Sequence, residues 1–103
     1  ALQEAMSAYQ IKIIEGAVPK TLPEVDAEQI AYLSLDMNCA EPEVEALEYF
    51  WDRIVPGGLV VFDDYAYTDF TRNQRVAHDC FASSKGLKIL NLPTCQGVLI
   101  KPA

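Results

Sequence analysis

The sequence has few basic residues and no long apolar run, and each shortage excludes a class of protein. Eight Lys and Arg residues stand against fifteen Asp and Glu residues, which gives a formal charge of −7. Binding to a nucleic-acid backbone depends on clustered basic residues, so we expect no nucleic-acid partner. No stretch approaches the roughly 20 apolar residues that cross a bilayer, and the N-terminus lacks the basic start and apolar centre of a signal peptide. We therefore expect a soluble, cytoplasmic protein with no membrane partner.

Cysteine and histidine are also too scarce for several kinds of site. The three cysteines, Cys39, Cys80 and Cys95, show no C-x-x-C spacing, which indicates reduced thiols rather than disulfides or a zinc site. The only histidine is His78, and its place on a predicted helix favours core packing over catalysis. The sequence has no G-x-G-x-x-G loop, so these residues provide no dinucleotide or Walker-type phosphate cradle.

The residues that are present have the composition of one globular domain. The chain has 103 residues, of which 50% are hydrophobic and 22% charged, and this length excludes two full domains. Apolar spacing and turn residues predict the elements in order. They are a helix over 2–9, strands over 11–15 and 30–35, a helix from Pro42 that Pro56-Gly57-Gly58 stops, a strand over 59–62, a helix from the N-cap Thr71 to Gly86, and a hairpin of strands 87–92 and 98–101.

Each of the last two helices has a predicted core face. In the helix that starts near Pro42, an apolar stripe with Phe50 beside it predicts that the acidic residues occupy a solvated opposite face. The stripe is Val44, Leu47, Trp51 and Ile54, and the acidic residues are Glu41, Glu43, Glu45, Glu48 and Asp52. In the following helix the apolar positions are Val76, Ala77, Cys80 and Phe81.

Aspartates follow two of the predicted strands. Strands that alternate with helices indicate an α/β layered fold with parallel crossovers, here ending in an antiparallel hairpin, and such sheets bind ligands beyond the carboxyl ends of their strands. Asp36 follows Leu35, and the pair Asp63-Asp64 follows Phe62. Adjacent strands lie roughly 5 Å apart, so these carboxylates repel one another unless a cation, a raised pKa or capping of backbone donors compensates.

An all-oxygen set of ligands favours Mg²⁺ or Ca²⁺ over zinc. Successive strand residues point to opposite faces, so Asp63 and Asp64 share one ion only if the chain bends after Phe62. The alternative is that Asp36 and Asp64 merely cap loops or helix ends.

Several short motifs occur in a fixed order along the chain. They are Glu15-Gly16, Thr21-Leu22-Pro23, Leu33-Ser34-Leu35-Asp36, Glu41, Pro56-Gly57-Gly58, Asp63-Asp64-Tyr65, and Arg75-Val76-Ala77 continuing to Phe81. Together they resemble the C-terminal half of the macrocin O-methyltransferase (TylF-like) family, class I enzymes that use S-adenosylmethionine. The resemblance implies a partial Rossmann-like fold, a three-layer sandwich with a mostly parallel sheet that ends in an antiparallel hairpin.

The resemblance also implies roles for individual residues. Asp36, Asp63 and Asp64 match the family's Mg²⁺ ligands, which hold the hydroxyl of a small-molecule acceptor and help to lower its pKa. Gly16 and Ala17 fall where such enzymes approach the adenine ring of S-adenosylmethionine, although Gly16 also suits a plain turn. Tyr65 is a candidate for the acceptor pocket, with core packing as the alternative.

Two positions depart from the family pattern. Asn38 stands where the family has a second aspartate, a candidate general base, and an amide cannot accept a proton as a carboxylate does. Ala40 stands where a tyrosine is usual. The catalytic base is therefore unassigned.

The family's cofactor loop has no counterpart in these residues. In the family, the glycine-rich loop belongs to the first strands of a sheet with order 3-2-1-4-5-7-6, and nothing in residues 1–103 matches it. We therefore expect residues 1–103 to form a single domain, the C-terminal part of a methyltransferase, inactive alone. The alternative is a non-enzymatic module that self-associates through an exposed sheet edge. We expect strand 11–15 to close against 30–35 or to pair with a second copy.

Overall fold

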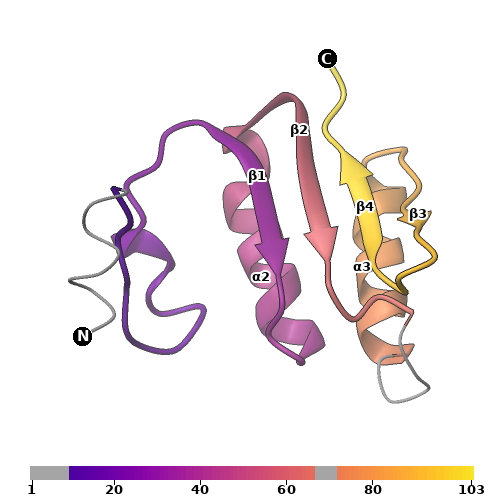
Figure 1. The fold of residues 1–103 in the computed structure, drawn as a ribbon, viewed down its shortest axis with the longest axis horizontal. Coiled ribbons are helices and arrows are strands. Elements are labelled where there is room, and N and C mark those ends of the chain that lie inside the picture. Colours follow the sequence, from indigo (N-terminus) through magenta and orange to yellow (C-terminus); the bar gives the residue numbers. More distant parts are fainter. Residues whose placement is uncertain (1–9, 67–71) are drawn as a thin grey trace.

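A four-stranded sheet with two helices on one of its faces forms the body of the molecule (Figure 1). The computed structural model describes residues 10–66 and 72–103. The predicted helix over 2–9 and the predicted N-cap Thr71 lie outside these residues. The helices are α2 (Ala40–Phe50) and α3 (Arg72–Ser84), with short 3₁₀ turns η1 (Leu22–Glu24) and η2 (Trp51–Arg53), and the strands are β1 (Ile30–Leu35), β2 (Ile54–Phe62), β3 (Leu90–Asn91) and β4 (Gly97–Ile100).

The sheet combines a parallel pair with an antiparallel hairpin. Its strand order is β1-β2-β4-β3. Strands β1 and β2 run parallel and are connected through α2, whereas β4 is antiparallel to both β2 and β3. This confirms the predicted α/β fold and its closing hairpin. The described helices α2 and α3 both lie behind the sheet in Figure 1, so these residues form two layers.

Strand β2 begins earlier than the sequence predicts. The sequence predicts that Pro56-Gly57-Gly58 ends the helix before a strand starting at Leu59, but β2 already begins at Ile54 and contains all three residues. The register between β1 and β2 shifts at this point: Ile30 pairs with Ile54, but Tyr32, two residues later, pairs with Leu59. A Cβ on Gly58 would lie 2.8 Å from the Val55 carbonyl oxygen, so this close backbone approach requires glycine.

Most of the stripe predicted for this helix is buried and, unexpectedly, so is one acidic residue. Leu47 and Phe50 on α2 are buried, as are Trp51 in η2 and Ile54 at the start of β2, whereas Val44 is only half-buried. The prediction that all the acidic residues are solvated is wrong for Glu43, whose exposed fraction is 1%. Glu43 precedes Leu47 by one helical turn, so it shares the face that packs against the sheet and α3.

Helix α3 packs through a face that matches the predicted one only in part, because Phe81 is buried and Ala77 is half-buried. Its buried residues are Gln74, His78, Phe81 and Ala82, whereas Val76 and Cys80 are exposed. The predicted face was therefore wrong at Val76 and Cys80, because polar Gln74 and His78 turn inward to meet Glu43 on α2. His78 is 1% exposed, which confirms its predicted place in the core.

Residues 11–15 do not form the predicted strand. They have no regular secondary structure, and β1 pairs only with β2 among the described residues. The prediction failed because β-branched residues favour a strand only when a partner strand is available. The segment that follows is held by Arg53, whose Nη1 donates to the carbonyl oxygens of Val25 and Ala27 at 3.2 Å each.

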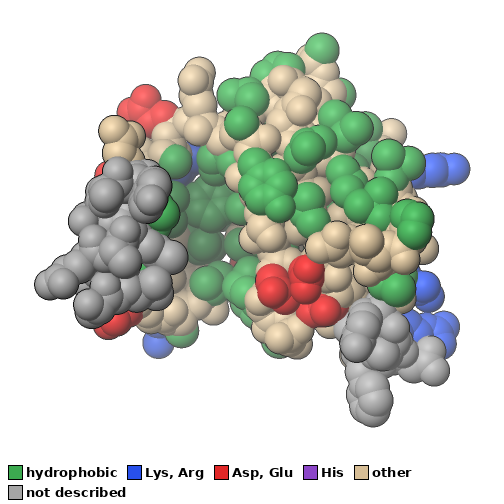
Figure 2. Space-filling model, in the orientation of Figure 1, with side chains coloured by type: hydrophobic (Ala, Val, Ile, Leu, Met, Phe, Trp, Pro, Cys, Tyr) green, Lys and Arg blue, Asp and Glu red, His purple; other side chains and the backbone are tan. Residues whose placement is uncertain are grey.

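The face of the sheet opposite the helices carries apolar side chains. Tyr32, Leu59 and Ile100 stand side by side across β1, β2 and β4, and Tyr32 is 59% exposed. Figure 2 shows hydrophobic side chains gathered over this face, and no described helix covers it.

Within residues 10–66 and 72–103, no helix is long and apolar enough to cross a membrane.

Candidate metal site at the carboxyl ends of β1 and β2

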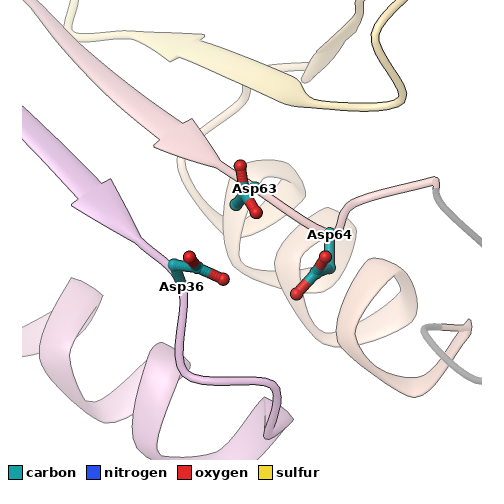
Figure 3. A group of neighbouring side chains, drawn as sticks. All are labelled: Asp36, Asp63 and Asp64. Carbon is teal, nitrogen blue, oxygen red and sulfur yellow. The ribbon is translucent and has the colours of Figure 1, made fainter.

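Three aspartates meet where β1 and β2 end. Asp36 follows β1, and Asp63 and Asp64 follow β2. One carboxylate oxygen from each of the three lies within 4.8 Å of the others, and Figure 3 shows the Asp36 carboxylate directed toward the other two. The structure thus brings together the three residues that the strand ends predicted.

Backbone pairing and a turn create this arrangement. Leu35 pairs with Phe62 in the parallel register, and the Asp63 N–H donates to the Leu35 carbonyl oxygen at 3.0 Å. The chain then turns over residues 63–66, where the Ala66 N–H donates to the Cys95 carbonyl oxygen at 2.9 Å. This is the bend after Phe62 that lets two consecutive aspartates face one centre.

The three carboxylates have different surroundings. Asp36 is exposed, and the Oδ1 atom of Asp63 accepts a hydrogen bond from Gln96 Nε2 at 2.9 Å. The Oδ2 atom of Asp64 is buried and has no hydrogen-bond partner among the described residues. A buried acceptor without a partner is costly, so Asp64 Oδ2 is an atom that a cation would satisfy.

Repulsion within the cluster changes the acidity of Asp36. The negative charge of Asp63 raises the pKa of Asp36, and desolvation and the charge of Asp64 add to this effect. The cluster contains carboxylate oxygens and no nitrogen or sulfur ligand. Such a donor set fits a hard divalent ion, Mg²⁺ or Ca²⁺, better than zinc.

A buried carboxylate lies directly behind the cluster. Glu43 Oε2 accepts a hydrogen bond from the Met37 backbone N–H at 2.9 Å. Glu43 Oε1 lies 3.0 Å from His78 Nε2 and accepts from Gln74 Nε2 at 3.1 Å. Burial alone would raise the pKa of Glu43, but the hydrogen bonds from His78, Met37 and Gln74 together lower it. Glu43 is therefore a buried carboxylate attached to the loop that carries Asp36.

Sequence reasoning missed this network, although one signal was available. Glu43, Leu47, Phe50 and Ile54 recur at helical spacing, so a stripe drawn through these residues would have placed Glu43 inward. Its partners Gln74 and His78 lie 31 and 35 residues further along the chain, and no local pattern links them to it.

The two departures from the family pattern lie between Asp36 and the first turn of α2. Asn38 adopts a left-handed backbone conformation with φ 56°, which asparagine tolerates better than most residues. Ala40 is the first residue of α2, and its N-cap Cys39 makes no side-chain capping hydrogen bond. No carboxylate stands at position 38, so the catalytic base stays unassigned.

Gly16 and Ala17 belong to the segment that precedes β1, which Figure 1 shows on the side of β1 away from β2. Gly16 has φ 134°, and a Cβ there would lie 2.5 Å from Thr21 Cγ2. The Ala17 carbonyl oxygen accepts hydrogen bonds from both N and Oγ1 of Thr21, at 3.1 Å each. These contacts make a tight turn, and the contact with an adenine ring stays a prediction.

Tyr65 points into the protein. Its side chain is buried, and its hydroxyl donates to Asp79 Oδ1 at 2.5 Å. Burial first, and then the hydrogen bond to Asp79, raise the pKa of Tyr65 to about 12. Tyr65 therefore packs in the core, which is the alternative that the sequence left open. Its contact with a methyl acceptor stays a prediction.

Fold and site together define part of a Rossmann-like α/β domain with acidic strand ends. The sequence matches the family model of the macrocin O-methyltransferases (TylF) over residues 5–90, and the chain belongs to this family.

One protein sequence and one solved structure are similar to this chain. The chain is 37% identical over 57 residues to the 8-demethyl-8-(2,3-dimethoxy-alpha-L-rhamnosyl)-tetracenomycin-C 4'-O-methyltransferase of Streptomyces olivaceus. These 57 residues are 55% of this chain and 22% of that protein. The fold is similar to that of the O-methyltransferase NovP, with a TM-score of 0.82 and 17% identity over 99% of this chain and 44% of NovP. The chain thus spans less than half the length of each relative.

Proposed function

We propose that this chain is the metal-binding part of an S-adenosylmethionine-dependent O-methyltransferase. In this proposal Asp36, Asp63 and Asp64 hold Mg²⁺, or Ca²⁺ in its place. The observation that carries it is the convergence of three carboxylates within 4.8 Å, one of them with a buried oxygen that lacks a partner in the described part of the chain. Membership of the O-methyltransferase family supports the same assignment.

The chain's own residues prepare this site for a hydroxyl acceptor. Gln96 orients the Asp63 carboxylate, and the turn after Phe62 directs Asp64 toward Asp36. A divalent ion held there would supply Lewis-acid activation, which lowers the pKa of an acceptor hydroxyl. The name of the Streptomyces protein describes a 4'-O-methyltransferase, which supports a small-molecule hydroxyl as the acceptor.

Metal titration tests this proposal directly. Calorimetry with Mg²⁺ and Mn²⁺ is expected to show one site in the 103-residue chain, and Asp64→Asn is expected to weaken it at least tenfold. Asp52→Asn is the matched control, because Asp52 is an exposed acidic residue outside the cluster. Equal affinities in the chain and in Asp64→Asn would refute the metal site.

The cofactor part of the proposal is tested separately. We propose that Gly16 and Ala17 approach the adenine ring of S-adenosylmethionine, while the glycine-rich loop that holds the rest of the cofactor has no counterpart in residues 1–103. The chain alone is therefore expected to be inactive and to bind S-adenosylmethionine weakly in calorimetry. A micromolar affinity would contradict this expectation.

A second candidate function is self-association through the edge of the sheet. Strand β1 pairs on one side only among the described residues, and a shallow groove beside it is lined by apolar residues that include Ile30, Leu33 and Phe50. Unpaired edges and exposed apolar faces favour association, here with a second copy of this chain. Size-exclusion chromatography with light scattering, run at several concentrations, is expected to show a dimer. A monomer at every concentration would contradict this candidate.

A further inference from the structure

The peptide groups on both sides of Asp36 are fixed by hydrogen bonds. On the N-terminal side, the Leu35 carbonyl oxygen accepts from the Asp63 N–H at 3.0 Å. On the C-terminal side, the Met37 N–H donates to Glu43 Oε2 at 2.9 Å. The first bond belongs to the sheet, whereas the second depends on one side chain of α2.

Glu43 is itself held rigidly. Its exposed fraction is 1%, and its other oxygen, Oε1, meets both His78 Nε2 and Gln74 Nε2 of α3. Because the Glu43 carboxylate can only accept, His78 Nε2 donates to its Oε1, whereas His78 Nδ1 is buried and has no partner among the described residues. The His78 ring in turn packs on Phe62, with ring centroids 4.2 Å apart, and Phe62 is the residue that precedes Asp63.

We propose that Glu43 is a positioning residue for the metal site. Through the Met37 amide it fixes the peptide that follows Asp36, and so holds the Asp36 carboxylate toward Asp63 and Asp64. His78 and Gln74 complete this hydrogen-bond network, because their contacts with Oε1 prevent the Glu43 side chain from rotating away from Met37. This inference rests on the proposed metal site, and it assigns to Glu43 no contact with the metal or the acceptor.

The chemistry of the site explains why a carboxylate is needed at position 43. Both oxygens face donors: one backbone N–H at Oε2, and two side-chain N–H groups at Oε1. An amide supplies one acceptor atom and one donor group, so one orientation of Gln at position 43 sets an N–H against the Met37 N–H. The other orientation keeps the Met37 bond but requires His78 to move its proton to the buried Nδ1, which has no partner among the described residues. Either orientation weakens one of the two anchors while the volume of the side chain is kept.

Mn²⁺ binding, followed by the electron paramagnetic resonance signal of the free ion, tests the inference. Residues that orient metal ligands typically change affinity 10–100-fold, so Glu43→Gln is expected to weaken Mn²⁺ binding by about tenfold or more. Gln74→Met, which removes one hydrogen bond to Oε1 and leaves the other contacts of Glu43, is expected to weaken it by less than Glu43→Gln does. Glu48→Gln is the matched control, because Glu48 lies on the same helix and is exposed, and its affinity is expected to stay unchanged.

The measurements are made well below each variant's melting temperature, so that a purely structural role would lower the melting temperature without changing Mn²⁺ affinity. Unchanged affinity in folded Glu43→Gln, together with weakened binding in Asp64→Asn, would overturn the positioning role and leave the metal site in place. Unchanged affinity in Asp64→Asn would instead refute the metal site itself. If Glu43→Gln does not fold, Gln74→Met decides: weaker binding supports the inference, and unchanged binding overturns it.

Discussion

The backbone N–H of Asp63 lies 3.0 Å from the carbonyl oxygen of Leu35, and this hydrogen bond joins β1 and β2 where both strands end. It brings Asp36, the residue after Leu35, beside Asp63 whatever the charges on their side chains. The sheet thus forces carboxylates together that would otherwise separate. The free energy of this repulsion is offset by the rest of the fold in the absence of a cation.

Asp36→Asn is expected to stabilise the metal-free chain at neutral pH, because it removes one charge from the cluster. The charge of Asp63, then desolvation, then the charge of Asp64 raise the pKa of Asp36. The contribution of Asp36 to the free energy of unfolding is therefore fully present below its ordinary pKa of 3.8. This contribution is lost as the pH rises through the raised pKa of the folded state. Thermal melts from pH 3 to 8 are expected to show that the advantage of Asp36→Asn grows with pH.

The same melts with added Mg²⁺ provide the control. Mg²⁺ is expected to raise the melting temperature of the unchanged chain more than that of Asp36→Asn, because the variant has lost a ligand. A melting temperature for metal-free Asp36→Asn below that of the unchanged chain at pH 7 would contradict the repulsion argument.

Tyr65→Phe is expected to destabilise the chain by about 1–2 kcal/mol, because it removes a hydrogen bond from a buried hydroxyl to the Asp79 carboxylate. Tyr32→Phe is the control, because Tyr32 is 59% exposed, and its effect is expected to stay within about 0.5 kcal/mol. Urea unfolding of both variants measures the difference. Equal stabilities of the two variants would show that the Tyr65 hydroxyl contributes nothing.

The phenol of Tyr65 is expected to be the last tyrosine to ionise. Burial and the Asp79 bond raise its pKa to about 12, so the stability linked to Tyr65 is complete below pH 10.0 and is lost as the pH approaches about 12. The chain contains five tyrosines, and ultraviolet titration of Tyr65→Phe is expected to lack the highest step. Loss of an earlier step would contradict the assignment.

Gly97→Ala is expected to cost about 1–3 kcal/mol, because the added methyl group overpacks the sheet. A Cβ at this position would lie 2.7 Å from Tyr65 Cγ and 2.8 Å from Ile89 Cγ2. Neither neighbour is the free end of a long, flexible side chain, so the strand or the Tyr65 ring must shift. Ser34→Ala, at an exposed strand position, is the control and is expected to change stability by less than about 0.5 kcal/mol. Urea unfolding that gives the two variants equal stabilities would contradict the overpacking argument.

The parts of the fold that were predictable depend on local patterns. The continuous apolar runs that end at Leu35 and Phe62 identified β1 and β2. Because the two strands are parallel and adjacent, the aspartates that follow them were predicted to lie close together. The hairpin of β3 and β4 was likewise marked by its turn residues. The site was thus predictable because its three aspartates follow strands.

The parts that were missed depend on contacts between distant residues. Glu43 lies in an acidic stretch that is typical of a solvated face. Its hydrogen bonds with Gln74 and His78 offset the free-energy cost of burying its carboxylate. Residues 11–15 have the composition of a strand, but pairing requires a partner, and no described strand lies against them. Pro56-Gly57-Gly58 has the composition of a turn, yet the shift in pairing with β1 accommodates it inside β2.

A crystal structure of the chain grown with Mn²⁺ tests the central claim most directly, since Mn²⁺ takes the same oxygen ligands as Mg²⁺ and its anomalous signal locates it. We expect one strong anomalous peak between Asp36, Asp63 and Asp64, about 2.1 Å from an oxygen of each carboxylate. A fully occupied Mn²⁺ elsewhere, or no peak at these three residues at saturating Mn²⁺, would contradict the proposed metal site.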